Sequence, residues 1–416
     1  MSVSGALSPR LHRLPGGRRW PVLRAGHQVR LLQSGTEFFP ALERGINAAI
    51  ESVSIETYLF HDDPSGRRIA AALARAAQRG VRVRVVVDGF GTGIPQGAVA
   101  ALLAASPVEL RIFRPLSRWR WRRHALRRLH RKLALIDGTT LFVGGINLID
   151  DHADPVRGVL ESPRLDFAMA VRGPLVDDAV RAMRRVWHRS QPARTGAPGA
   201  NGTPSPRDEA DTQAGIEGVD CEPRRVRAAF AERDNWRNRR TIERAYLRAI
   251  GQARDDVIIA CAYFFPGAKF RRALAEAASR GVRVRLLLQG RIEYRLPHFG
   301  TLALHEELLR AGVEIIEYQP GFLHAKLALA DQWFTIGSSN IDPFSLLLAR
   351  EANVIVRDRE LAMALRARIE HAIAEGGRPV RWSHIVARPW WVRAAALGAA
   401  FMLRVGVALS GRGLRY

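Results

Sequence analysis

The stretch LHRKLALID at residues 129–137 recurs almost unchanged as LHAKLALAD at residues 323–331. Both copies fit the pattern His-x-Lys-x4-Asp. Each is followed by a turn of small residues that ends in asparagine, GGIN at residues 144–147 and GSSN at residues 337–340. A single copy would be weak evidence, because most histidines near a strand are structural. Two copies with matching turns indicate a duplicated site that transfers phosphoryl groups through a covalent histidine intermediate.

Lysine is almost absent from the rest of the chain. Of the 64 lysine and arginine residues, only Lys132, Lys269 and Lys326 are lysines. Two of these three stand in the motifs. Arginine presents a wide planar fork, whereas lysine presents a compact point charge. We therefore expect Lys132 and Lys326 to lie in a tight pocket around a phosphate.

The duplication extends over both halves of the chain. RGVRVR at residues 79–84 recurs at residues 280–285, and an alanine-rich helical stretch precedes each copy. Strands that alternate with helices favour a mostly parallel sheet covered by helices, so we expect two homologous α/β halves. The strands expected on either side of these repeats are residues 53–60, 108–113, 257–265 and 313–318.

Composition suggests the domain boundaries. One segment is rich in Pro, Gly, Ala and Thr and lacks apolar periodicity, which is typical of a flexible linker. The N-terminus has no apolar core of a signal peptide. The expected division is a basic N-terminal segment, a first domain, a flexible linker, a second domain and a C-terminal tail, at residues 1–25, 26–189, 190–223, 224–376 and 377–416.

The formal net charge of +24 indicates an anionic partner, either nucleic acid or an acidic membrane surface. The first half carries an insertion rich in arginine and tryptophan near residues 117–129. This insertion could bind nucleic acid or an anionic membrane, or it could be a solvated loop. Two cysteines, Cys221 and Cys261, indicate neither a disulfide framework nor a zinc site. A reducing cytoplasmic setting is the expectation.

The C-terminal tail favours the membrane. Trp390 and Trp391 precede an apolar stretch that Arg393 and Arg404 interrupt, and at 100° per residue these arginines share one helical face. The longest charge-free run, residues 394–403, is too short to span a bilayer. We expect an amphipathic helix at the membrane interface. A final helix docked on the protein core is the alternative.

The motif residues fit a phosphate site. His and Lys stand two residues apart in a strand-like run, so their side chains share one face, while Arg131 or Ala325 between them points the other way. The glycine-containing turns bring peptide N–H groups and an asparagine amide close to bound phosphate. Glu56 ends a β run toward the same cleft, with Cys261 or Ala262 as its expected counterpart, and would bind a glycerol hydroxyl or pair with an arginine.

On these residues the chain resembles the phospholipase D superfamily and, within it, bacterial cardiolipin synthases. The resemblance covers residues 26–376. It implies an α/β fold of two homologous phospholipase D-like α/β/α sandwich domains, packed around a pseudo-twofold axis with one active site at their interface. The segments that carry it are RRLHRK at 127–132, GGIN at 144–147, DH at 151–152 and SSNID at 338–342.

The resemblance also implies roles for individual residues. His130 would attack phosphorus, His324 would act as general acid and base, and the two lysines would neutralise phosphate oxygens. A carboxylate downstream of each turn would orient an imidazole. The expected catalytic residues are His130, Lys132, Asp137, His324, Lys326 and Asp331, with Asp137 and Asp331 either catalytic or structural. The expected substrate-binding residues are Asn147, Asn340, Gly145 and Ser338, and the histidine-orienting residues are Asp166 and Glu351.

The resemblance implies a phosphatidyltransferase that makes cardiolipin from phosphatidylglycerol through a phosphohistidine. A phospholipase D that releases phosphatidic acid and, less favoured, a nuclease are the alternatives. We expect no metal and no cofactor, because two lysines and two donor turns already supply positive charge. The expected partners are anionic phospholipids at the cytoplasmic face of the cell membrane, bound peripherally, without nucleic acid.

Overall fold

The computed structural model describes residues 21–115, 127–193, 226–234, 238–342, 345 and 349–409. Most of the expected N-terminal segment and linker lies outside these residues, as do Cys221 and the Arg/Trp run at 118–123. The predictions made for those segments stay predictions.

The first half contains the elements expected around its repeat. The predicted strands at 53–60 and 108–113 are confirmed as β2 and β4. In order, the elements are β1 (Arg24–Gln33), α1 (Ser34–Ala48), β2 (Ser52–Thr57), α2 (Pro64–Gln78), β3 (Arg82–Asp88), α3 (Gly97–Ala104), β4 (Glu109–Phe113), β5 (Lys132–Ile136), β6 (Thr140–Gly144), β7 (Ala153–Asp154), β8 (Gly158–Val159), β9 (Phe167–Arg172), α4 (Val176–Trp187) and β10 (Gln191–Pro192).

The second half repeats this order and adds a C-terminal extension. Its elements are β11 (Val226–Arg233), α5 (Thr241–Gln252), β12 (Asp256–Cys261), α6 (Ala268–Ser279), β13 (Arg283–Gln289), α7 (Arg295–Leu302), α8 (His305–Arg310), β14 (Glu314–Tyr318), β15 (Lys326–Ala330), β16 (Trp333–Gly337), β17 (Glu351–Arg357), α10 (Arg359–Gly376), β18 (Gly377–Pro379), α11 (Trp382–Val386) and α12 (Trp390–Leu409).

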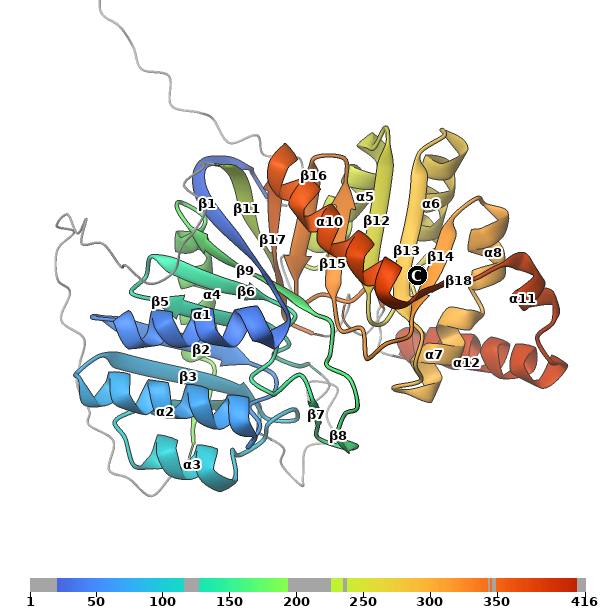
Figure 1. Cartoon of the computed structure of the whole chain (residues 1–416). Helices are drawn as coiled ribbons and strands as arrows, with labels where there is room; N and C mark the ends of the chain where they lie inside the picture. The colour runs from blue at the N-terminus through green and yellow to red at the C-terminus, as the bar shows by residue number, and fades with distance from the viewer. Residues whose placement is uncertain are drawn as a thin grey trace, which may run out of the picture.

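The strand order reads the same from both ends. The sheet runs β10-β4-β3-β2-β5-β6-β9-β1 and continues as β11-β17-β16-β15-β12-β13-β14-β18. Equivalent strands therefore lie at equal distances from the β1–β11 pair, which confirms two homologous halves related by a pseudo-twofold axis (Figure 1).

The expectation of a mostly parallel sheet is wrong. Among the strands that the structure describes, parallel pairs join only β2–β3–β4 and β12–β13–β14. The other strand pairs are antiparallel. The reason is local. Each motif strand, β5 or β15, turns back at once into the next strand, and a turn this short permits only an antiparallel pair.

The repeated RGVRVR segment marks the end of equivalent helices. Gly80 follows α2 with φ of +89°, and Gly281 follows α6 with φ of +87°. Glycine adopts this left-handed conformation without steric cost and so ends a helix readily. The following Val-Arg alternation enters β3 and β13, which places the apolar side chains in the cores.

Three large apolar cores and one small cluster stabilise the described part of the molecule. One lies under α1 and α2, and a second lies under α5 and α6 (Figure 1). The third contains buried side chains from both halves, including Leu133, Met169, Leu327 and Val354, together with residues of α4 and α10. This shared core fixes the halves against each other and so fixes the site between them.

The C-terminal extension is attached to the second half rather than forming a separate tail. β18 pairs with β14, and α12 packs on α7, where the Leu403 side chain lies against Gly300. Ala396, Ala400 and Leu403 are buried. The alternative of a docked helix is therefore correct for one face of α12. Among the described residues, no helix is both long and apolar enough to cross a membrane.

Candidate active site

Both motif histidines line one cavity of about 620 Å³ between the halves. Each histidine lies two residues before the start of its strand, β5 or β15, and its backbone bonds to the opposite half. His130 N–H donates to the Arg350 carbonyl at 3.0 Å, and His324 N–H donates to the Leu165 carbonyl at 2.8 Å. The next residue after each of these carbonyls is the predicted orienting carboxylate.

The histidine–carboxylate pairs cross between the halves. His130 Nδ1 lies 3.1 Å from both carboxylate oxygens of Glu351, and His324 Nδ1 lies 2.6 Å from Oδ2 of Asp166. Nδ1 is engaged in both rings, so Nε2 is the nitrogen available for chemistry. Asp166 and Glu351 therefore lie where orienting residues are expected, and neither half could form this arrangement alone.

Burial controls the protonation of this site. It lowers the pKa of His130, opposed by the Glu351 charge, and it lowers the pKa of His324 strongly, assisted by the Lys326 charge. Burial also raises the pKa of Asp166 to about 7. Neutral imidazole is thus favoured at His130, as a nucleophile requires.

The two lysines are buried beside their histidines. Lys132 Nζ donates to the His130 carbonyl at 2.8 Å, and Lys326 Nζ donates to the His324 carbonyl. Burial lowers the pKa of Lys132 to about 7 and also lowers that of Lys326. The expected tight surroundings of these lysines are therefore present.

The small-residue turns are equivalent in position but different in chemistry. Ser338 donates its hydroxyl to Oε2 of Glu351 at 2.5 Å. The equivalent Gly145 lies against Asp166, and a Cβ atom there would come within 2.3 Å of Oδ1. Both residues support the orienting carboxylates, and neither lines the cavity.

The two asparagines also differ. Asn147 lines the cavity, and its Oδ1 accepts the Leu59 N–H at 3.2 Å. Because the amide oxygen is used in this way, Nδ2 is the amide atom that can donate to a substrate. Asn340 is 3% exposed, and its Nδ2 donates to the Ser345 hydroxyl at 3.4 Å. Of the four residues predicted to bind substrate, only Asn147 lies on the cavity wall.

The contacts of the motif aspartates favour the structural alternative of the two that the sequence left open. Asp137 accepts backbone N–H bonds from residues 50, 51 and 52, and Asp331 accepts them from residues 254, 255 and 256. Both lie at the far end of the motif strand, away from the histidines. Each ties the turn after that strand to the start of the neighbouring one.

Glu56 pairs with an arginine and does not line the cavity. Arg131, which points away from the histidine face as predicted, bonds to Glu56 at 2.6 Å and to Glu232 at 3.1 Å. Burial raises the pKa of Glu56 to about 7, against the opposing Arg131 charge. The strand register makes Ala260 its counterpart, rather than Cys261 or Ala262.

A model of the family described as cardiolipin synthase, PLD-like domain, matches residues 42–155 and 246–373. Cardiolipin synthase B of Escherichia coli strain K12 is 34% identical over 400 residues, which cover 93% of this chain and 90% of that protein. The chain belongs to the cardiolipin synthase family. Cardiolipin synthase A of Pseudomonas entomophila strain L48 is 31% identical over 355 residues, 85% of this chain and 69% of that protein.

Solved structures share the fold of this cardiolipin synthase family member. The phosphatidylserine synthase of Haemophilus influenzae Rd KW20 matches with a TM-score of 0.69 at 15% identity, covering 95% of this chain and 97% of that one. The polyphosphate kinase of Porphyromonas gingivalis matches with a TM-score of 0.52 over 91% of this chain and 55% of that one. At such identities the likeness concerns the fold.

Further residues on the cavity wall of this cardiolipin synthase family member were not predicted. The Tyr58 ring meets the His130 ring edge to face at 5.1 Å, and Arg128 stacks on Phe90 at 4.3 Å. These residues stand outside the repeated motif, so no spacing revealed them. The others with a polar side chain are Asp151, Asp154, Arg164, Tyr263, Glu293, Tyr294 and Ser345.

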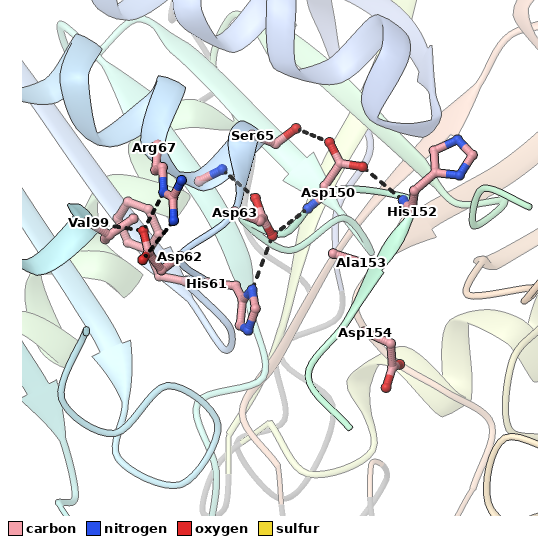
Figure 2. A network of polar contacts seen from close by, with 12 residues as sticks. His61, Asp62, Asp63, Ser65, Arg67, Val99, Asp150, His152, Ala153 and Asp154 are labelled. Carbon is pink, nitrogen blue, oxygen red and sulfur yellow. Dashed lines mark hydrogen bonds and ion pairs between the residues drawn. The ribbon is translucent and has the colours of Figure 1, made fainter. Parts of the chain in front are cut away.

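A polar network behind the wall fixes the loop that follows the first asparagine turn. Asp63 accepts the Asp150 N–H at 2.9 Å, and Asp150 accepts the Ser65 hydroxyl at 2.7 Å and the His152 N–H at 2.9 Å (Figure 2). Asp154 in the same loop binds Arg164 at 2.6 Å. The start of α2 thereby sets the position of one side of the cavity.

Proposed function

We propose that this enzyme makes cardiolipin by moving a phosphatidyl group from one phosphatidylglycerol to a hydroxyl group of another. The observation that carries the proposal is the pair of histidines, each oriented by a carboxylate of the opposite half, in one cavity. Family membership supports the same conclusion, because the relatives are named cardiolipin synthases.

The first step forms a covalent intermediate. Nε2 of His130 attacks the phosphorus of the donor, and the bond from phosphorus to the glycerol oxygen breaks. The negative charge of the bound phosphate favours the protonated form of His324, which gives its Nε2 proton to that oxygen, and glycerol leaves. Glu351 holds the His130 ring at Nδ1 and stabilises the positive charge that the ring gains.

The second step reverses these roles. A hydroxyl of the acceptor gives its proton to His324 Nε2 while its oxygen bonds to phosphorus, and the bond from phosphorus to His130 breaks. Lys132 and Lys326 stabilise the phosphate oxygens as negative charge shifts, and the Asn147 amide adds a hydrogen bond. The proposed order, with His130 as nucleophile, follows the resemblance to the phospholipase D superfamily. Burial lowers the pKa of both histidines and both have a carboxylate partner, so these two properties do not set the order.

We also propose that the enzyme binds peripherally to the cytoplasmic face of an anionic membrane, with the cavity mouth toward the lipid. Apolar side chains at the rim are exposed, among them Phe90, Val156 and Tyr294, which line the cavity. The neighbouring Val159 in β8 is 88% exposed. A rim of this kind suits an enzyme whose substrate must leave a bilayer.

Helix α12 extends the proposed membrane-binding surface. It packs on α7, which begins directly after the rim residue Tyr294, and Figure 1 shows both helices and the β7–β8 hairpin on one side of the molecule. Its side opposite the docked face exposes Trp390, Leu397 and Phe401. The net charge of +24 adds attraction to anionic headgroups.

A product assay tests the proposed reaction. Purified enzyme is incubated with phosphatidylglycerol vesicles, and lipid products are identified by mass spectrometry. We expect cardiolipin and glycerol from the wild type and from His371→Ala, a control whose side chain is 70% exposed on α10. His130→Ala and His324→Ala should form neither product.

Other products would redirect the proposal. Phosphatidic acid as the main product would mean that water is the acceptor and that the enzyme is a phospholipase D. Cleavage of DNA or RNA without any lipid product would mean a nuclease.

A further inference from the structure

The cavity wall carries a carboxylate that the phosphate chemistry does not use. Glu293 lies in the loop between β13 and α7 and lines the cavity together with Tyr263 and His324. A negative charge repels a bound phosphate, so it does not help a cavity that only holds phosphate groups. We therefore looked for a substrate group that a carboxylate would attract.

Tyr263 fixes one oxygen of this carboxylate. The tyrosine hydroxyl donates to Oε2 of Glu293 at 2.6 Å. Within the described part of the chain, the other oxygen, Oε1, accepts no hydrogen bond. The loop is held in place as well, because Arg157 of the first half donates to the backbone carbonyl of Glu293. One oxygen is thus anchored, and the other is left for a ligand.

The hydrogen-bonded pair of Tyr263 and Glu293 belongs to the second half. Strand register makes Leu59 the first-half counterpart of Tyr263, so the first half has no hydroxyl at this place. Tyr58 instead contacts His130 through its ring. The carboxylate anchored by a tyrosine hydroxyl therefore comes from the second half, which also contributes His324 to the cavity. His324 is the residue that exchanges protons with alcohols in the proposed mechanism.

We propose that Glu293 and Tyr263 form a subsite for the acceptor alcohol, in which Glu293 Oε1 binds the second hydroxyl of a vicinal diol. The glycerol headgroup of phosphatidylglycerol is such a diol, so this inference rests on the proposed function and deepens it. In the transfer step the first hydroxyl loses its proton to His324 and bonds to phosphorus, as the phosphorus–His130 bond breaks. The second hydroxyl keeps its proton and donates it to Glu293 in a hydrogen bond.

The test is a competition between two acceptors that differ by one hydroxyl. Enzyme and phosphatidylglycerol vesicles are supplied with 1-propanol and 1,2-propanediol at equal concentration, and phosphatidylpropanol and phosphatidylpropanediol are measured by mass spectrometry. A hydrogen bond to a carboxylate should favour the diol product about tenfold or more in the wild type. Glu293→Met should bring the ratio close to one, because formation of phosphatidylpropanediol falls more than formation of phosphatidylpropanol.

Two further variants make the result decisive. Glu161→Met changes the same residue type at a side chain that is 90% exposed, and it should keep the wild-type ratio. Tyr263→Phe removes the hydrogen bond that holds the Glu293 carboxylate in position, so it should lower the ratio of diol product to propanol product. This variant provides a second test if Glu293→Met does not fold.

Several results would overturn the subsite. A wild-type ratio in Glu293→Met, or an equal loss of both products, would mean that the residue is only structural. If the wild type forms cardiolipin but shows no preference for the diol, the subsite proposal is contradicted and the proposed function is not. If the wild type transfers the phosphatidyl group to no alcohol at all, both the subsite and the proposed function are contradicted.

Discussion

At the scale of single residues, the defining feature is that each histidine pairs with a carboxylate from the opposite half of the chain. Glu351 lies 221 positions from His130, and Asp166 lies 158 positions from His324. The repeated motif predicted the two histidines, and the resemblance to the phospholipase D superfamily implied the two carboxylates. The sequence could not predict the crossing, because strand pairing within each half says nothing about how the halves face each other.

Removing the charge of either carboxylate should affect chemistry more than stability. For Glu351→Gln and Asp166→Asn we expect kcat to fall by about a hundredfold or more, because the imidazole loses the partner that holds its tautomer. Ser338 keeps a hydrogen-bond partner in Glu351→Gln, so the fold should persist, as thermal unfolding would show. Wild-type kcat in both variants would contradict the assigned pairs.

The buried Lys132 should give the activity an alkaline limit. Its pKa is lowered to about 7, so the ammonium group is lost as the pH rises through that value, well below the usual range of lysine. We expect kcat/KM to fall above about pH 7 by up to tenfold per pH unit. Vesicle binding, measured over the same range, should stay constant because arginines do not titrate there. A level kcat/KM up to pH 9 would count against this role.

At the scale of elements, the turns after β6 and β16 show how far a repeat predicts a site. GGIN and GSSN are plainly equivalent in sequence, yet one supports its carboxylate by leaving space and the other by donating a hydroxyl. The sequence predicted both turns correctly. It assigned Gly145 and Ser338 to substrate because it could not show that a carboxylate fills the space behind them.

Gly145→Ala should impair the enzyme more than Ser338→Ala. The added Cβ would lie 2.3 Å from Oδ1 of Asp166 and push that carboxylate away from His324. Displacements of about 1 Å at a reacting group can cost a hundredfold in rate, so we expect a loss of at least about tenfold in kcat. Ser338→Ala loses only one hydrogen bond and serves as the comparison. Steady-state rates that rank the two variants in the opposite order would refute this account of the turns.

Glu293 and Tyr263 mark where sequence reasoning stopped. They lie in or next to loops, outside both motifs, and belong to one half only. A search for repeated patterns therefore passes over them. They became visible only because the fold brings β12 and the loop after β13 to the same cavity wall as His324.

At the scale of the whole molecule, the two halves make one site, and the cavity rim and α12 form the membrane-binding surface that we propose. The repeat predicted the two halves, and the resemblance to the phospholipase D superfamily implied one site at their interface. Period and charge predicted an amphipathic helix in the C-terminal tail, with docking on the protein core as the alternative. They could not identify α7 as the docking partner, since a helical wheel does not reveal which side faces protein.

The exposed face of α12 should contribute to membrane binding. Leu397 and Phe401 are 68% and 67% exposed on that face. We expect the double variant Leu397→Asp/Phe401→Asp to bind phosphatidylglycerol vesicles at least about tenfold more weakly, because two apolar side chains no longer enter the lipid. Met363→Asp, at a residue 51% exposed on α10, is the matched control. Equal vesicle affinity of all three proteins in a flotation assay would remove α12 from the proposed surface.

The central claim is that both halves build one site in which His130 carries the phosphatidyl group. The most direct test traps that intermediate. Enzyme is mixed with short-chain phosphatidylglycerol, quenched in alkali, digested and examined by peptide mass spectrometry. The account predicts a phosphatidyl adduct on the peptide that contains His130, and none in His130→Ala. An adduct on His324, or cardiolipin formation without any histidine adduct, would contradict it.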